Sequence, residues 1–229
     1  MKHHEAFNQS HASLYDEQWK KLAPMTGGLH FLIKILLKNL PEDAHILCVG
    51  AGTGAEIMAL ASAFPKWRFT AVEPSGPMLE VCRAKLQEAG FLSRCHLHHG
   101  YLSTLHANVK FNAATAILVS QFCMNKTERI QFFKEINDSL KSESYLISAD
   151  LSSPESPQTA EDLLETWKKA LLFADIPEEK AQAATASWGK QVAISQENEI
   201  EDIIREAGFK KTCHFYQSLF IHGWYSLTS

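Results

Sequence analysis

The stretch "HILCVGAGTGAE", residues 45–56, constrains the fold more than any other part of the chain. Its near-continuous apolar start is typical of a strand that is covered on both faces of a sheet. The strand leads into Gly50, Gly52 and Gly54, after which a helical pattern begins. Glycines at this density allow the backbone to approach a ligand closely. The stretch therefore predicts a strand, a ligand-binding turn and a helix, in that order.

The same alternation continues along the chain. Short apolar runs at 67–73, 94–100, 111–122 and 144–150 are separated by helical patterns. Such alternation predicts a mostly parallel sheet with helices on both faces. A last helix at about 196–207 is followed by two strands with a short connection, which indicates an antiparallel pair. We therefore expect an α/β, Rossmann-like, seven-stranded, mostly parallel sheet whose last strand is antiparallel.

The length of 229 residues is long for one domain and short for two. We expect a single domain over 1–229 with two lids, because the segment after residue 150 breaks the rhythm of strands and helices. Its expected parts are an N-terminal helical cap (1–40), a ligand-binding core (41–150), a helical insertion (151–195), and the last helix with the C-terminal strand pair (196–229).

Composition and charge limit which partners the protein can bind and where in the cell we expect it. A net charge of −4 gives no general attraction to nucleic acid or to an anionic membrane. The most apolar run, 29–40, contains two lysines and is shorter than the roughly 20 residues of a membrane span. The N-terminus lacks the apolar core of a signal peptide, and the five cysteines form no C-x-x-C pair. We expect a cytoplasmic protein with no membrane partner, for which nucleic acid is an improbable ligand.

The glycine turn fits the fingerprint Gly50-x-Gly52-x-x-Ala55, and Glu73 lies about where that fingerprint places a ribose-binding acid. Gly50 lets the chain turn off the strand, and Gly52 keeps a side chain out of the ligand's path. Glu73 can accept both hydroxyls of a ribose. The motif alone does not separate a nicotinamide dinucleotide from other adenosine-containing ligands.

The residues around this motif resemble those of a known family. "VGAGTGAE" and "VEPSGPML" resemble motif I and the following acidic motif of class I S-adenosylmethionine (SAM)-dependent methyltransferases. The family's acid followed by Ser-x-x-Met stands here as Glu73, Ser75 and Met78. The resemblance continues in "HHGYLSTL", "AILVSQFCMNKTERIQFFKEINDSLK" and "YLISADLS". It covers about 40–150 well and 196–229 more loosely.

This resemblance implies transfer of a methyl group from SAM by in-line displacement, which leaves S-adenosylhomocysteine (SAH). It assigns cofactor binding to eleven positions: Gly50, Ala51, Gly52, Glu73, Pro74, Ser75, Met78, Tyr101, Leu102, Val119 and Ser120. Glu73 would hold the ribose, Met78 would pack on the adenine, and Val119 with Ser120 would flank the sulfonium. Tyr101 departs from the family pattern, since an Asp that accepts from the adenine amino group usually stands there.

The methyl acceptor leaves weaker signals. Methyl transfer requires alignment and exclusion of water, and it needs a base only where the acceptor must lose a proton. No catalytic residue is assigned, although Gln121 and Asp150 are candidates at strand ends; a turn cap is the other interpretation of Asp150. Candidates for the acceptor pocket are Tyr15, Trp19, Gln121 and Trp188, with Tyr15 and Trp19 equally suited to anchoring an N-terminal helix.

The insertion carries seven acids against three lysines between 155 and 180, which disfavours a polyanionic acceptor. We therefore expect a small-molecule acceptor, methylated at oxygen or nitrogen.

The histidines of "HLHH" at 96–99 alternate between strand faces and cannot converge on one ion, and His222 with Trp224 is interpreted as structural. We expect no metal site.

Two other functions stay open. A nicotinamide-dependent oxidoreductase shares the glycine fingerprint, but the Ser-x-x-Met continuation and the antiparallel end strands disfavour it. A non-catalytic SAM- or SAH-binding protein is the second, given the change at Tyr101. The chain is also loosely similar to the carboxy-SAM synthase family of tRNA wobble-uridine modification, which holds the added carboxylate with an arginine of the last helix. In this chain Ile203 stands at about the position of that arginine, and Arg205 falls on a different face of the helix. We interpret the similarity as shared ancestry and not as shared activity. The sequence specifies no oligomeric state.

Overall fold

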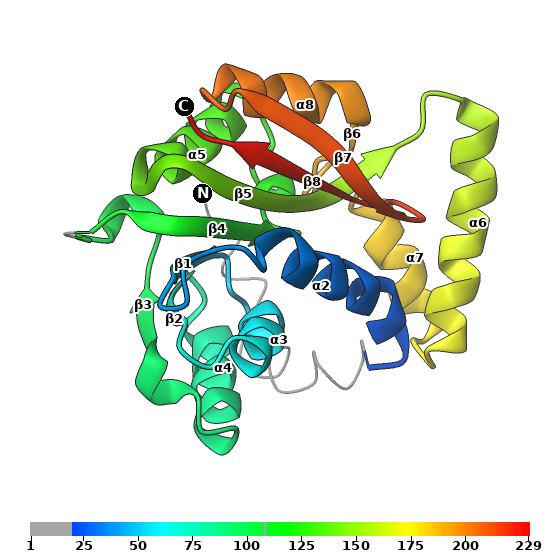
Figure 1. Ribbon diagram of the computed structural model, residues 1–229. Helices are drawn as coiled ribbons and strands as arrows, with labels where there is room; N and C mark the ends of the chain where they lie inside the picture. Colours follow the sequence, from blue (N-terminus) through cyan, green and yellow to red (C-terminus); the bar gives the residue numbers. More distant parts are fainter. Residues whose placement is uncertain (1–19, 108) are drawn as a thin grey trace.

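The sheet that the sequence predicts is the centre of the molecule (Figure 1). The structure, a computed structural model, describes residues 20–107 and 109–229. Within them the strand order is β3-β2-β1-β4-β5-β8-β7, and the short β6 pairs with β5. The strands are β1 (His45–Val49), β2 (Arg68–Glu73), β3 (Cys95–His99), β4 (Phe111–Ile117), β5 (Leu140–Ser153), β6 (Ser195–Gln196), β7 (Lys211–Ser218) and β8 (Ile221–Leu227).

The pairing of the strands confirms the predicted topology. The pairs β1–β2, β1–β4, β2–β3 and β4–β5 are all parallel. β8 inserts between β5 and β7 and runs antiparallel to both. The carboxyl ends of β1, β2, β4 and β5 therefore meet at one edge of the sheet, on either side of the point where the strand order reverses. Ligands of open α/β sheets bind at such an edge.

Helices cover both faces of the sheet (Figure 1). One face packs against α2, α3 and α4, and the other packs against α5 and α8. The remaining α6 and α7 come from the insertion and lie next to the end of the hairpin that joins β7 and β8 (Figure 1). The bounds are α2 (Ala23–Leu37), α3 (Ala55–Ala63), α4 (Gly76–Glu88), α5 (Lys126–Ser139), α6 (Pro157–Phe173), α7 (Glu178–Ala186) and α8 (Glu197–Glu206).

Two of the expected helix starts are set by side-chain caps. Ser75 Oγ accepts a hydrogen bond from the backbone N–H of Met78 at the start of α4. Asn125 Oδ1 accepts one from the N–H of Glu128 at the start of α5. Such caps satisfy N–H groups that the first turn of a helix leaves without intrahelical partners. The capping residues therefore fix where the chain leaves each strand-end loop and becomes helical.

The structure differs from the predicted boundaries in two informative places. β4 ends at Ile117, not near residue 122, because Leu118 has a left-handed φ of 57° and residues 120–122 form a 3-10 turn. β5 is twice as long as predicted, since it pairs with β4, β6 and β8 along 140–153. In both places, contacts from distant parts of the chain override the local apolar pattern.

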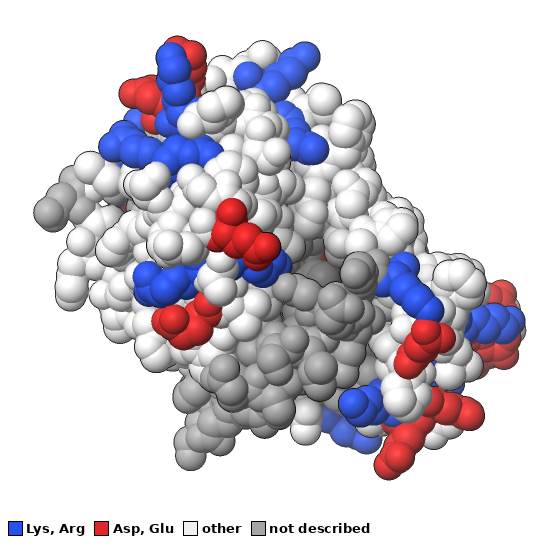
Figure 2. Space-filling model, turned by 90° about the horizontal axis from the view of Figure 1, so that it is seen from below, with Lys and Arg blue, Asp and Glu red and all other residues white. Residues whose placement is uncertain are grey.

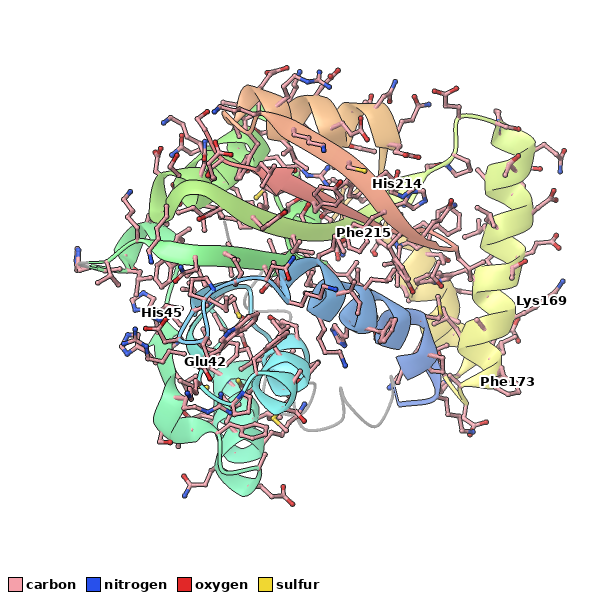
Figure 3. All side chains as sticks on the ribbon, viewed as in Figure 1. Glu42, His45, Lys169, Phe173, His214 and Phe215 are labelled. Atoms are coloured by element: carbon pink, nitrogen blue, oxygen red, sulfur yellow. The ribbon has the colours of Figure 1, made fainter. Side chains whose placement is uncertain are left out.

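The insertion has a small apolar core of its own. Trp167 and Leu171 of α6 are buried against Phe220 and Ile221 at the β7–β8 hairpin. At the end of α6, Phe173 points away from this core and is 80% exposed (Figure 3).

Of the helices described, none combines the length and the apolar character that crossing a membrane requires. Figure 2 shows Lys and Arg interspersed with Asp and Glu over the face it views, so the described residues of that face form no continuous basic surface.

The packing of α2 yields a stability prediction. Ile33 on α2 is buried in the core on that face of the sheet, whereas Phe31 on the same helix is 57% exposed. Ile33→Ala should lower the free energy of unfolding by about 2–5 kcal/mol, because it leaves a cavity in the core. Phe31→Ala, the matched control, should change it by less than about 0.5 kcal/mol. Urea unfolding of both variants measures this, and equal losses would contradict the described placement of α2.

Candidate functional site

The turn after β1 requires glycine for two separate reasons. Gly50 has a φ of 67°, a left-handed conformation that L side chains rarely adopt. A Cβ at position 50 would also lie 2.4 Å from Cγ2 of Val119, which is closer than side-chain atoms can approach. The glycine turn therefore packs directly against the residues that follow β4, and the two loops form one edge of the site.

Glu73, the last residue of β2, connects that turn to the next helix. Its Oε2 accepts a hydrogen bond from the N–H of Gly52 at 2.9 Å, and its Oε1 accepts one from the N–H of Ser75 at 2.8 Å. The side chain is buried, and burial raises the pKa of Glu73, while the two N–H donors oppose the shift. One carboxylate thus holds the glycine turn and the start of α4 in a fixed relation.

Other predicted residues of the cofactor site lie around this carboxylate. Met78 and Leu102 are buried, and a Cβ added to Gly52 would lie 3.7 Å from Cε of Met78. A side chain at position 52 would therefore lie in ordinary van der Waals contact with Met78, in space that glycine leaves open. Tyr101 is half-buried just after β3, where its carbonyl accepts a hydrogen bond from the N–H of Thr104.

The loop after β4 is held by a buried polar network. Ser120 Oγ donates to the Asp150 carboxylate at 2.8 Å, and the Gln121 N–H donates to it at 3.0 Å. Arg129 Nε donates to Ser120 Oγ at 2.7 Å, and its guanidinium lies 3.3 Å from Asp150. The side chains of Asp150 and Arg129 are almost completely buried. The network joins the ends of β4 and β5 to α5.

The backbone before this network is strained. Leu118 has a left-handed φ of 57°, and its N–H donates to the Ala149 carbonyl at 2.7 Å. A non-glycine residue in this region costs of order 1–3 kcal/mol and persists only where the surroundings impose it. Such strain is concentrated at functional sites. Here it lies immediately before Val119 and Ser120, at the edge where a ligand is expected.

Comparison with known proteins finds a methyltransferase domain in this chain. The methyltransferase domain family matches residues 46–143, which contain the glycine turn, Glu73 and the loop after β4. The matched residues form a methyltransferase domain, and the fold around them is that of class I SAM-dependent methyltransferases. The chain is an enzyme, and SAM is its cofactor.

The relatives are distant in sequence. The chain is 23% identical over 217 residues to the carboxy-S-adenosyl-L-methionine synthase of Campylobacter jejuni, covering 90% of this chain and 86% of that protein. It has the fold of a protein assigned as an O-methyltransferase from Nostoc punctiforme (TM-score 0.66, 18% identity, 90% of this chain and 58% of that one). It also has the fold of a SAM-dependent methyltransferase from Clostridium acetobutylicum (TM-score 0.60, 15% identity, 87% and 89%).

The residues of this methyltransferase fit its cofactor. Each oxygen of Glu73 accepts one backbone N–H, which leaves further lone pairs for ribose hydroxyls. Gly52 leaves room beside Met78 that a side chain would fill. Ser120 contributes differently from the expectation for a residue that flanks the sulfonium: its hydroxyl is fully buried and bonded to Asp150 and Arg129.

The residues predicted to act on the methyl acceptor lie in different environments. Asp150 caps the turn at 120–122, as the alternative interpretation of the sequence held, and Gln121 accepts a hydrogen bond from the Leu151 N–H. Trp188 packs with Trp167 and Phe220 in the core of the insertion. Tyr15 and Trp19 lie outside the described residues. Arg129, which no sequence motif indicated, is the group that compensates the charge of Asp150.

A second buried acid lies behind the glycine turn. Glu56 is in the first turn of α3, and burial, followed by the nearby charge of Glu73, raises its pKa to about 7. In the unfolded chain its carboxyl ionises near 4.5. The folded state therefore binds the proton more tightly, and its stability falls as the pH rises from about 4.5 through about 7.

Glu56→Gln should remove this pH dependence. At pH 5 the variant and the parent protein should have similar stability. At pH 8 the variant should be more stable by up to about 3 kcal/mol, at about 1.4 kcal/mol for each unit of pKa shift. Urea unfolding at both pH values measures the difference, and a gain that is equal at pH 5 and pH 8 would contradict the assignment to Glu56.

Arg129→Met should lower the free energy of unfolding by about 3–5 kcal/mol, because it leaves the buried Asp150 carboxylate without its counter-charge. Adding Asp150→Asn should cost less than the sum of the two single changes, since the unpaired charge is then absent. A double-mutant cycle by chemical denaturation tests the coupling. Additive losses would show that the two side chains do not compensate each other.

Proposed function

We propose that this enzyme transfers the methyl group of SAM to a small molecule, at an oxygen or nitrogen atom. The buried Glu73 carboxylate between the glycine turn and α4 carries the proposal, because it lies within the matched methyltransferase domain and could accept the ribose hydroxyls of SAM. SAM supplies an electrophilic methyl group on a sulfonium. The chain's own residues then have to bind, orient and exclude water.

Each part of the proposed site has a definite task. Glu73 binds the ribose, and Met78 with Leu102 provides an apolar surface for the adenine. The glycine turn lets the backbone follow the methionine portion of the cofactor. The loop of Val119 to Gln121 borders the reacting centre, and the bonds of Asp150 and Arg129 keep that loop in one conformation. We assign no general base.

A charge argument favours SAM over a dinucleotide. A pyrophosphate would lie at the N-terminus of α3, where the buried Glu56 stands close enough to Glu73 for their pKa values to be linked. The Glu73 carboxylate, and Glu56 to the extent that it is ionised above its pKa of about 7, oppose a dianionic ligand. The sulfonium and ammonium of SAM are cationic, so the same acids attract this cofactor.

The synthase relative suggests a second candidate, formation of carboxy-SAM. Two observations weaken it for this chain. Ile203 is buried in the core beneath α8, and Arg205 is largely exposed and pairs with Asp202. These placements give the carboxylate of a carboxylated cofactor no buried arginine partner at either position of α8. Incubation with SAM and prospective acceptors, followed by mass spectrometry, separates methylated products from a carboxylated cofactor.

Glu73→Gln is the direct test of the cofactor site. It keeps the size of the side chain but removes the charge that accepts the ribose hydroxyls. SAH affinity, measured by calorimetry, should fall by at least about 100-fold, since two hydrogen bonds to a charged group are each worth about 1.5–3 kcal/mol.

Glu80→Gln on the exposed face of α4 is the matched control and should leave SAH affinity unchanged. Thermal shifts with SAH, NADH and NADPH complete the test. Stabilisation by NADH or NADPH without stabilisation by SAH would exclude methyl transfer. Unchanged SAH affinity in Glu73→Gln would mean that another residue binds the ribose.

A further inference from the structure

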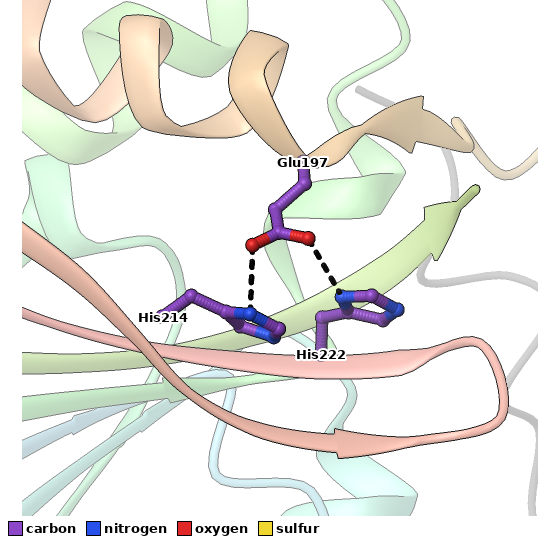
Figure 4. A group of neighbouring side chains, drawn as sticks. All are labelled: Glu197, His214 and His222. Carbon is purple, nitrogen blue, oxygen red and sulfur yellow. Dashed lines mark ion pairs between the residues drawn. The ribbon is translucent and has the colours of Figure 1, made fainter. Parts of the chain in front are cut away.

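Three side chains with metal-binding atoms meet where α8 begins above the terminal hairpin (Figure 4). Glu197 is the first residue of α8, His214 lies on β7, and His222 lies on β8. Figure 3 shows His214 on the part of β7 beneath α8. One ligand atom from each residue lies within 4.8 Å of the others. Two strands and a helix, separated by loops, thus converge on one small volume.

The register of the hairpin explains why the two histidines face the same way. His214 is the cross-strand partner of Trp224, and His222 lies two residues before Trp224 on β8. Residues two apart on a strand share a face, so both imidazoles project toward α8. Their rings are stacked, with centroids 4.8 Å apart. The Glu197 carboxylate lies across both, with Oε1 2.7 Å from His214 Nδ1 and Oε2 3.8 Å from His222 Nδ1.

The polar atoms of this cluster are incompletely satisfied. His222 is 3% exposed, and neither of its ring nitrogens has a hydrogen-bond partner among the described residues. His214 Nε2 is buried without a partner as well. Leaving a buried polar group without a partner costs about 1–3 kcal/mol, so native structures rarely do it. A nitrogen lone pair buried beside a carboxylate is what a cation would satisfy.

The ligand chemistry selects the cation. The ring nitrogens of the buried His222 make no hydrogen bond among the described residues, so an imidazole lone pair is available to a cation. Two imidazoles and one carboxylate suit Zn²⁺ and related transition metals, whereas Mg²⁺ prefers oxygen ligands. Glu197 is 44% exposed on its side chain, which leaves an entry route and a position for water as the fourth ligand.

We propose that Glu197, His214 and His222 bind one Zn²⁺ ion, which fastens the start of α8 to the β7–β8 hairpin. Near-tetrahedral bonds of about 2.0–2.1 Å require the three ligand atoms to lie closer than their present spread. The imidazole planes are within 11° of parallel, so one ring must turn about its Cβ–Cγ bond to aim both lone pairs at the ion. The partly exposed Glu197 can follow that movement.

Metal binding to the full-length protein, first stripped with a chelator, tests the site. Calorimetry with Zn²⁺ should show one saturable equivalent, and Co²⁺ should give the visible absorption bands of a tetrahedral complex. Mg²⁺ should give neither signal. Glu197→Gln and His214→Asn should each weaken Zn²⁺ binding by more than the 10- to 100-fold that loss of an outer-shell partner causes. Zn²⁺ should also raise the melting temperature of the parent protein.

His96→Ala provides the matched control, because His96 is an exposed histidine on the distant strand β3. Its Zn²⁺ affinity should equal that of the parent protein. Circular dichroism establishes that each variant is folded, and Glu197→Gln preserves the length of the helix side chain. Absence of saturable binding in the parent protein, or equal affinity in the parent, Glu197→Gln and His214→Asn, would overturn the proposal.

Discussion

One carboxylate fixes the geometry on which the cofactor site depends. Glu73 ends β2, yet its two oxygens bind the backbone of the turn after β1 and the residue that caps α4. Three elements that the sheet brings to one edge are thereby held together, with the carboxyl group between them. Backbone N–H groups make these bonds, so the bonds need no side chain of the turn, whereas replacement of Glu73 removes both acceptors at once.

A second buried charge stabilises the opposite half of the same edge. Asp150 caps the loop after β4, and Arg129 enters from α5 to compensate its charge. Neutral side chains could fill this space at similar or lower cost, since burying an ion pair costs several kcal/mol per ion in lost hydration. The pair contributes directional contacts, because charged hydrogen bonds hold the loop and the strained Leu118 backbone in one arrangement. The ion pair therefore serves to position the loop more than to increase the net stability of the fold.

The sequence predicted the parts of this protein that depend on local patterns. The strand, turn and helix around Gly50 follow from apolar periodicity and glycine chemistry, and the mostly parallel sheet with helices on both faces follows from the alternation of elements. The end of β4 was misplaced because the left-handed Leu118 is imposed by contacts with β5, which no local pattern encodes. The Arg129–Asp150 pair and the cluster around Glu197 join distant segments, so no spacing rule could have found them.

The acid at the end of β2 would also affect the two forms of the cofactor differently in the proposed site. SAM carries a sulfonium charge, and SAH, left after methyl transfer, does not. The buried Glu73 would attract the charged form across a region of low dielectric, where such attractions exceed those in water. When the methyl group leaves, this attraction weakens while the ribose and adenine contacts persist. On that proposal, the carboxylate that draws the cofactor in would hold the spent form less tightly, which would favour its exchange for the next molecule.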